Sequence, residues 1–397
     1  MNFISAHTHS IFADFSDNVA SVTLIGGDLG DVLRGGSGND ALNGGSGNDT
    51  IEGGLGANRI DGGSGANTLS YANVGITNPR LAYGVVVDLA DGFAYNWGRS
   101  LDDAIANVQN IVGTSIKDYL YGNAAANVFE GGAGADNIDG RGGNDTVSYE
   151  HSGAGVIVSL ATGFGTGRSG DDGGDYILNV ENLTGSRYAD SLTGDAGANR
   201  LYGYAGADTL AGGDGADTYI VRDVRASVVE AEGQGTDRVE AAVNYTLTDN
   251  VENLTLISNA IDGTGNALAN VITGSAKANV IDGKGGLDVL YGKGGDDTFA
   301  FSTALGAGNV DRIVDFDSTD TIRLDSTIFS QLSAGDLPDD VFKNLDLGRQ
   351  DANDKILYDQ DTGRLFYDAD GKGGEAAKLF ALIGNHADLD ASDFRIV

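Results

Sequence analysis

A nine-residue unit that recurs seventeen times constrains this chain more than any other feature of its 397 residues. The clearest copies follow one another directly: residues 35–43 read GGSGNDALN, and residues 44–52 read GGSGNDTIE. The shared pattern is G-G-x-G-x-D-x-U-x, in which U is a large apolar residue and the sixth place holds Asp or Asn. A short fixed period of this kind predicts a solenoid rather than two or three globular domains.

The internal chemistry of the unit predicts its local structure. Its glycine-rich first six residues suit a turn with positive φ angles, and the x-U-x that follows suits a very short strand with one inward side chain. Two units then make one coil, and stacked coils give two parallel sheets that face each other across a core. The chain is therefore expected to be all-β, a parallel β-roll. The predicted core residues are Leu33, Leu42, Ile51, Ile60, Leu69, Leu120, Phe129, Ile138, Val147, Leu192, Leu201, Leu210, Tyr219, Ile272, Ile281, Leu290 and Phe299.

The repeats fall into four runs separated by three related inserts. The segment 84–93 is echoed by 155–164, and an N-V-x-N-U motif occurs in all three inserts. We expect the coil to continue through Ile111 and Leu183, and the inserts to form hairpins or longer strands that project from the roll. The expected segments are an N-terminal cap (1–25), roll run 1 (26–70), insert 1 (71–112), run 2 (113–148), insert 2 (149–184), run 3 (185–220), insert 3 (221–264), run 4 (265–300), and a C-terminal β-rich cap and secretion region (301–397).

The tail departs from the repeat pattern. It contains the strand-like stretches 311–316, 321–324, 355–358 and 365–367, followed by an apolar stretch, 375–382, that we interpret as a short helix. A solenoid needs a cover over its last open coil, and the apolar content of the tail suits it to that role.

The sixth position of each unit predicts a metal site. Calcium takes six to eight oxygen ligands, and glycine-rich turns expose backbone carbonyls. In a two-unit coil, repeat n stacks on repeat n+2, so an ion between them receives side-chain and carbonyl oxygens from both turns. The predicted calcium ligands are Asp31, Asp40, Asp49, Asn58, Asn67, Asp118, Asn127, Asp136, Asp145, Asp190, Asn199, Asp208, Asp217, Asn270, Asn279, Asp288 and Asp297.

The same geometry predicts which of these side chains stack. Two-carboxylate pairs should be the most anionic, and a mixed pair should bind calcium more weakly. The expected pairs are Asp31/Asp49, Asp118/Asp136 and Asp190/Asp208 with two carboxylates, and Asp40/Asn58, Asp49/Asn67, Asn127/Asp145, Asn199/Asp217, Asn270/Asp288 and Asn279/Asp297 with one. The alternative is that Asp and Asn only hydrogen-bond their own turns. Strict register disfavours it, because a tight turn needs no acid at the same place every time.

The charge of the chain agrees with a need for cations. It has 24 Lys and Arg against 58 Asp and Glu, a net charge of −34, and no Cys. Such a chain repels itself, so we expect calcium to decide whether it folds, and we expect no nucleic-acid partner. No apolar stretch is long enough for a transmembrane helix. The first nine residues lack the basic and apolar regions of a standard signal peptide.

With these repeats, the chain resembles the repeats-in-toxin (RTX) proteins over residues 26–300, and the segment 311–325 is similar to the one that follows the roll in serralysin-type proteases. The resemblance implies a calcium-bound parallel β-roll. It also implies secretion by a one-step type I machinery that reads an uncleaved C-terminal signal. The ending 393–397 is similar to such signals, although Arg395 interrupts the pattern. Low cytosolic calcium would keep the chain unfolded for export, and external calcium would fold it.

Sequence motifs also bear on activity. The protease string H-E-x-x-H and the lipase string G-x-S-x-G are both absent, and no long segment free of repeats remains for a catalytic domain. We therefore expect no enzyme but a secreted structural or cell-surface protein that associates with itself in a lattice or filament. The alternatives are an adhesin or carbohydrate-binding module that recognises cell-surface polysaccharide, or an enzyme whose site is not recognisable. Tyr83, Phe93, Tyr95 and Trp97 of insert 1 are either contact residues for association or pack the insert onto the roll.

Overall fold

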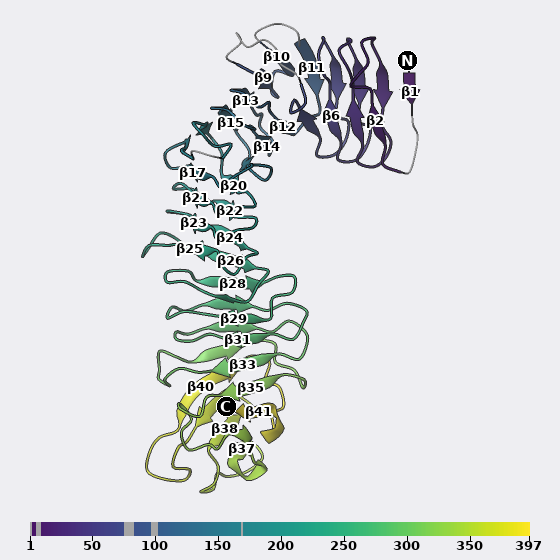
Figure 1. The fold of residues 1–397 in the computed structure, drawn as a ribbon. Coiled ribbons are helices and arrows are strands. Elements are labelled where there is room, and N and C mark those ends of the chain that lie inside the picture. The colour runs from purple at the N-terminus through teal and green to yellow at the C-terminus, as the bar shows by residue number, and fades with distance from the viewer. Residues whose placement is uncertain (1, 5–8, 75–82, 97–101, 168–169) are drawn as a thin grey trace. The chain divides into compact units, whose positions relative to one another are not determined.

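The computed structural model describes residues 2–4, 9–74, 83–96, 102–167 and 170–397. Among these residues, the regular elements are β-strands apart from two short 3-10 helices, η1 (Asp339–Val341) and η2 (Ala391–Asp393) (Figure 1). The chain forms two compact units, Met1–Gly212 and Gly213–Val397.

The first unit contains two sheets whose strands alternate along the chain. Sheet I runs in the order β1 (Asn2–Ile4), β3 (Thr23–Ile25), β5 (Ala41–Asn43), β7 (Arg59–Asp61), β11 (Asp102–Ala106), β10 (Phe93–Asn96), β9 (Val85–Asp88), β13 (Tyr119–Tyr121), β15 (Asn137–Asp139), β19 (Tyr176–Leu178), β18 (Phe164–Gly165), β17 (Ile157–Ser159), β21 (Ser191–Thr193) and β23 (Thr209–Ala211). Sheet II is parallel throughout, with β2 (Phe12–Asp14), β4 (Val32–Arg34), β6 (Thr50–Glu52), β8 (Thr68–Ser70), β12 (Asn110–Val112), β14 (Val128–Glu130), β16 (Thr146–Ser148), β20 (Asn182–Thr184) and β22 (Arg200–Tyr202).

The register of these strands is the one that the repeat predicts. Leu33 pairs with Ile51 in sheet II, two repeats further along the chain, and Leu42 pairs with Ile60 in sheet I. All seventeen eighth-position side chains are buried, which confirms the predicted core. Glycine is required in the turns, because Gly45 has φ 98° and an added Cβ there would lie 2.4 Å from the carbonyl oxygen of Gly27.

The described strands of inserts 1 and 2 lie within the roll, so the prediction that the inserts project from it is wrong for these strands. In insert 1, β10 pairs antiparallel with both β9 and β11, as expected of a hairpin. However, β11 also pairs in parallel with β7 of run 1, and β9 with β13 of run 2. Insert 2 repeats the arrangement with β17, β18 and β19. The hairpin strands are thus spliced into sheet I, where their backbone groups complete the ladder.

Sheet II passes the inserts without interruption. Ile111 of β12 pairs with Leu69 on one side and Phe129 on the other, and Leu183 of β20 pairs with Val147 and Leu201. The prediction that the coil continues through Ile111 and Leu183 is confirmed.

The second unit also contains two sheets. A two-residue strand, β25 (Ser227–Val228), lies between the first two strands of sheet III along the chain. Sheet III holds β24 (Thr218–Val221), β26 (Arg238–Ala241), β28 (Asn253–Leu256), β30 (Val271–Thr273), β32 (Val289–Tyr291), β34 (Asp311–Ile313), β40 (Lys378–Ile383), β39 (Arg364–Tyr367), β38 (Ile356–Asp359) and β37 (Phe342–Asn344). Sheet IV holds β27 (Tyr245–Thr246), β29 (Asp262–Thr264), β31 (Val280–Asp282), β33 (Thr298–Phe301), β35 (Thr321–Leu324), β41 (Phe394–Ile396) and β36 (Gly335–Asp336).

The tail extends both ladders beyond the last repeat. β34 pairs with β32 and β35 pairs with β33, both in parallel, and the four strand-like stretches of the tail each contain a strand. The expected helix at 375–382 is wrong, because residues 378–383 form β40, which pairs with β34 and β39. Phe380 and Ile383 of that strand are buried. At the other end of the chain, β1 and β2 pair with β3 and β4, so residues before 26 add strands to the roll.

Candidate calcium sites

The seventeen predicted ligands share one environment. Each lies in the turn directly before a strand, so the apolar residue two places later enters the core and the ligand side chain stays at the edge of the sheet. All seventeen are buried, with at most 4% of the residue exposed. Burial of so many carboxylates and amides requires partners for their oxygens.

Eight of the nine predicted pairs stack as expected. In each pair the backbone N–H of the first residue donates to a side-chain oxygen of the second. The N···O distances are 2.8 Å for Asp31/Asp49, 2.7 Å for Asp118/Asp136, 3.1 Å for Asp190/Asp208, 2.9 Å for Asp40/Asn58, 3.0 Å for Asp49/Asn67, 2.7 Å for Asn127/Asp145, 2.7 Å for Asn270/Asp288 and 2.8 Å for Asn279/Asp297. Asn199 and Asp217 belong to different units, and their pairing stays a prediction.

Some of these carboxylates also bond their own turns, as the alternative interpretation expects. Oδ2 of Asp40 accepts the N–H of Gly36 at 2.8 Å, and Oδ2 of Asp190 accepts that of Ser186 at 2.6 Å. Other carboxylates of the series keep an oxygen that no hydrogen bond from the described residues satisfies. In the described part of the chain, buried Oδ2 atoms with no hydrogen-bond partner occur on Asp49, Asp136, Asp145 and Asp288. A turn that needed only a hydrogen-bond acceptor would not bury a second, unpartnered carboxylate oxygen.

Electrostatics point the same way. Burial raises the pKa of Asp136 to about 9, and the neighbouring carboxylates Asp175 and Asp118 add to the effect. Burial likewise raises the pKa of Asp118 and Asp145 to about 6. The charged form of each group is therefore unfavourable in the protein alone. A bound divalent cation reverses this preference, because it stabilises the ionised carboxylate.

Backbone carbonyls complete the donor set. A Cβ added to Gly44 would lie 2.2 Å from Oδ2 of Asp49 and 2.5 Å from the carbonyl oxygen of Gly62, so these oxygens from successive coils converge on one small region. Carboxylate, amide and carbonyl oxygens are hard ligands, which fits calcium and does not fit softer metals. The residues present therefore fit the ion that the repeat predicts.

Sequence reasoning missed ligand-like residues in the inserts and the tail. Each accepts the backbone N–H of a preceding ladder residue through a side-chain oxygen, as the repeat residues do. They are Asp103, Gln109, Asp175, Glu181, Asp237, Glu252, Asp311 and Asp320. The signal that identifies them is a carboxylate or amide two places before an inward apolar residue, as in Asp103 before Ile105.

Two of these residues satisfy both carboxylate oxygens within the protein. Asp103 accepts the N–H of Asn58 at 2.9 Å and the buried hydroxyl of Tyr71 at 3.0 Å. Asp175 accepts the N–H of Asp136 at 2.8 Å and the buried hydroxyl of Tyr149 at 2.8 Å. Inserts 1 and 2 thus each end one series of stacked side chains in sheet I with a tyrosine hydroxyl.

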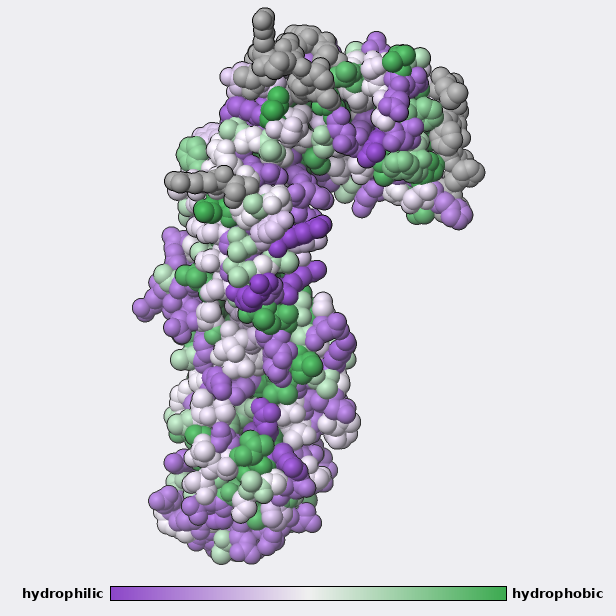
Figure 2. Space-filling model, in the orientation of Figure 1, coloured by the Kyte–Doolittle hydropathy of each residue, from purple (hydrophilic) through white to green (hydrophobic). Residues whose placement is uncertain are grey.

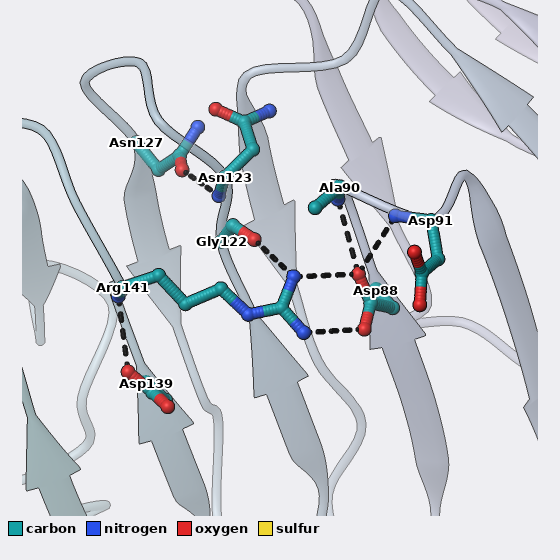
Figure 3. Close-up of polar contacts among 8 residues, drawn as sticks. All are labelled: Asp88, Ala90, Asp91, Gly122, Asn123, Asn127, Asp139 and Arg141. Carbon is teal, nitrogen blue, oxygen red and sulfur yellow. Dashed lines mark hydrogen bonds and ion pairs between the residues drawn. The ribbon is translucent and has the colours of Figure 1, made fainter.

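An arginine supplies the positive charge for one carboxylate of insert 1. Arg141 donates to both oxygens of Asp88, at 2.8 and 2.5 Å, and to the carbonyl oxygen of Gly122 at 3.0 Å (Figure 3). Burial alone would raise the pKa of Asp88, but its hydrogen bonds with Arg141 and with backbone N–H groups lower it overall. Arg141 occupies the second position of its repeat with φ 65°, a conformation that favours glycine.

The paired parallel sheets and the buried oxygens at their edges define a calcium-binding parallel β-roll. Residues 25–60, 34–69, 112–147, 184–219 and 264–299 match the family described as the RTX calcium-binding nonapeptide repeat (four copies). The chain carries RTX calcium-binding repeats, and its cofactor is calcium, bound as multiple ions. The match ends at residue 299, so the likeness of the tail to serralysin-type proteases stays a prediction.

No curated protein matches the chain. Among solved structures, it is similar to the extracellular lipase LipA from Serratia marcescens at 14% sequence identity and a TM-score of 0.19, a likeness too low to support any argument. That match covers 95% of this chain but only 40% of the lipase chain. In the described part of the protein, no helix is long and apolar enough to cross a membrane.

Proposed function

We propose that this chain is an extracellular protein that folds on calcium after secretion and serves a structural, non-catalytic role at a cell surface or in a matrix. The observation that carries the proposal is the set of buried carboxylate oxygens without hydrogen-bond partners, as on Asp49, Asp136 and Asp288. Those groups oppose folding until a cation arrives. RTX repeat proteins are typically secreted, and this supports a location in which calcium is abundant.

The size of the calcium effect is sufficient for a folding switch. Extracellular calcium modules bind at roughly 10⁻⁴ to 10⁻³ M. At calcium about tenfold above the dissociation constant, one site stabilises the folded state by about 1.4 kcal/mol. About eight independent sites would add roughly 11 kcal/mol, which is comparable with the whole stability of an ordinary domain. Export through a type I machinery before folding is consistent with this dependence.

A structural role rests on the repeats and on an open sheet edge. Strand β2 pairs only with β4 within the described residues, and it presents Phe12 with 65% of the residue exposed. An edge strand with unpaired backbone groups can add a strand from a second copy. On the face drawn in Figure 2, hydrophobic residues are dispersed among hydrophilic ones. Association through a sheet edge therefore suits this chain better than association through an apolar patch on that face.

A second candidate is an adhesin or carbohydrate-binding module, and one feature of insert 2 favours it. The rings of Phe164 and Tyr176 lie 5.2 Å apart between centroids, and both residues are exposed. Adjacent exposed aromatic rings suit contact with the apolar face of a sugar. In insert 1, Tyr83 is exposed, and its ring centroid lies 5.9 Å from that of Tyr119. Trp97 lies outside the described residues.

The test uses the full chain in calcium and in chelator. Far-ultraviolet circular dichroism should show β structure only with calcium, and an unchanged β signal in chelator would contradict the folding switch. Electron microscopy should show lattices or filaments in calcium that Phe12→Ser weakens. The matched control is Leu347→Ser, an exposed residue of the tail, which should leave them intact. Dispersed monomers whose polysaccharide binding depends on Phe164 would favour the adhesin instead.

A further inference from the structure

Insert 3 contains a nonapeptide that the family match does not include. Residues 232–240 read EGQGTDRVE, which fits the repeat pattern except for Glu at the first position. Gly233 at the second position has φ 80°, as the glycines of the repeat turns do. Asp237 occupies the sixth position, and Val239 occupies the eighth with its side chain buried. The matched residues stop at 219 and resume at 264.

This hidden repeat stacks on the repeat that contains Asp217. Strands β24 and β26 pair in parallel, with Tyr219 opposite Val239. The N–H of Asp217 donates to Oδ1 of Asp237 at 2.9 Å, as in the stacked pairs elsewhere. The two acids are 20 residues apart, compared with 18 in the other pairs. The longer connection allows another residue of the insert to enter the same region.

That residue is Glu230. One carboxylate oxygen each of Asp217, Glu230 and Asp237 lies within 4.8 Å of the others, and all three residues are buried. The hydroxyl of Tyr219 donates to Oε1 of Glu230, and Nδ2 of Asn250 donates to the Glu230 carbonyl oxygen at 3.0 Å. These bonds hold Glu230 in place, although it belongs to no repeat.

An unpartnered atom shows that the cluster needs a ligand. Oδ2 of Asp237 has no hydrogen-bond partner in the described part of the chain, and only 1% of Asp237 is exposed. Three carboxylates this close repel one another strongly in a buried site unless a cation lies between them.

We propose that Asp217, Glu230 and Asp237 together hold a calcium ion that fastens insert 3 to the roll. The site differs from the repeat pairs because it draws a third carboxylate from outside the nonapeptides. It goes beyond the proposed function, since it does not depend on surface assembly. Affinity for calcium rises with the number of charged ligands, so this site fills at lower calcium than the two-carboxylate pairs.

Calcium binding to a matched pair of variants tests the site. Glu230→Gln removes the third carboxylate while its side-chain oxygen still accepts from Tyr219. Glu232→Gln makes the same charge change two residues away on an exposed side chain. Equilibrium dialysis of the full chain against calcium should show that Glu230→Gln weakens the tightest ion by about tenfold or more. Glu232→Gln should match the wild type. Equal binding curves for the two variants would overturn the proposal.

A measurement on the unmodified protein covers the case in which Glu230→Gln does not fold. Crystals of the wild-type chain grown in calcium and soaked with terbium should give an anomalous peak bounded by the three carboxylates. Peaks at the repeat turns without one at this cluster would refute the site. That result would leave calcium-dependent folding intact, whereas loss of calcium-dependent circular dichroism would contradict the proposed function instead.

Discussion

Replacing Asp136 with Asn should change stability in opposite directions with and without calcium. Asp136 is fully buried, its Oδ1 accepts the N–H of Asp118 at 2.7 Å, and its Oδ2 has no hydrogen-bond partner among the described residues. Asn keeps an oxygen for that N–H but removes the charge. The substitution therefore isolates the carboxylate from the turn that it supports.

The magnitudes follow from the pKa of Asp136. A rise from 3.8 to about 9, caused by burial and then by Asp175 and Asp118, means that the folded chain without calcium holds this group protonated at pH 7. Each pH unit between 3.8 and 7 costs about 1.4 kcal/mol, so the carboxyl opposes folding by roughly 4 kcal/mol. Asn removes that cost. In calcium about tenfold above its dissociation constant, the same substitution loses about 1.4 kcal/mol for each site that it disrupts.

Urea unfolding followed by circular dichroism measures both effects. One series contains saturating calcium, and the other contains chelator with an excluded osmolyte that populates the folded state. The control is Asp139→Asn in the same repeat, a half-buried residue that accepts the N–H of Arg141 at 3.0 Å. Asp136→Asn should destabilise the chain in calcium and stabilise it in chelator. Shifts of the same sign in both series, or shifts equal to those of the control, would refute the reasoning.

Three further predictions concern pH, the arginine that pairs with Asp88 of insert 1, and the core. Burial raises the pKa of Asp136 to about 9 and that of Asp311 to about 8. Because the protonated form of such a group is favoured in the fold, its contribution to stability is greatest below pH 3.8 and is lost as the pH rises through the raised pKa. In chelator, lowering the pH from 8 to about 5.5 should therefore restore β structure by circular dichroism, and no recovery would count against buried carboxylates as the obstacle. Arg141→Ala should cost about 1–2 kcal/mol in urea unfolding through loss of the Asp88 pair. Arg141→Gly should cost about 1 kcal/mol less than Arg141→Ala, because glycine adopts the positive φ of this position without strain. Equal losses for the two variants would contradict backbone strain at residue 141. Phe129→Ala should cost about 3–5 kcal/mol in saturating calcium, whereas Val128→Ala on the exposed side of the same strand should cost under about 1 kcal/mol.

The repeat made the roll predictable because its register is local. Gly at the first, second and fourth positions, an oxygen ligand at the sixth and an apolar residue at the eighth fix a turn and a strand within nine residues. Stacking two units apart then follows from counting, and the pairs Asp31/Asp49 and Asn279/Asp297 form as counted. The unpartnered oxygen of Asp136 could not be predicted by counting residues, because it depends on which carboxylate oxygen each backbone N–H approaches.

The inserts were harder because their pairing is not local. The apolar residues of the inserts predict hairpins or longer strands, but the same residues suit a projecting hairpin and a strand spliced into sheet I. Ile105 pairs with Ile60, which lies 45 residues earlier, and no local pattern specifies that partner. The helix expected at 375–382 fails for a related reason. A short apolar run does not distinguish helix from strand, and the antiparallel partner β39 decides it.

The two edges of the first unit respond differently to the inserts. At the turns before the strands of sheet II, the series of stacked side-chain acceptors continues through both inserts. Asn67 donates its N–H to Gln109, and Asp145 donates its N–H to Glu181. At the turns before sheet I, the antiparallel strands β10 and β18 interrupt the series, and Asp103 and Asp175 end two of its segments. In a linear array, stability passes between neighbouring repeats. Calcium bound in one run therefore stabilises the next along sheet II, and the first unit should fold as one cooperative block even though sheet I is divided.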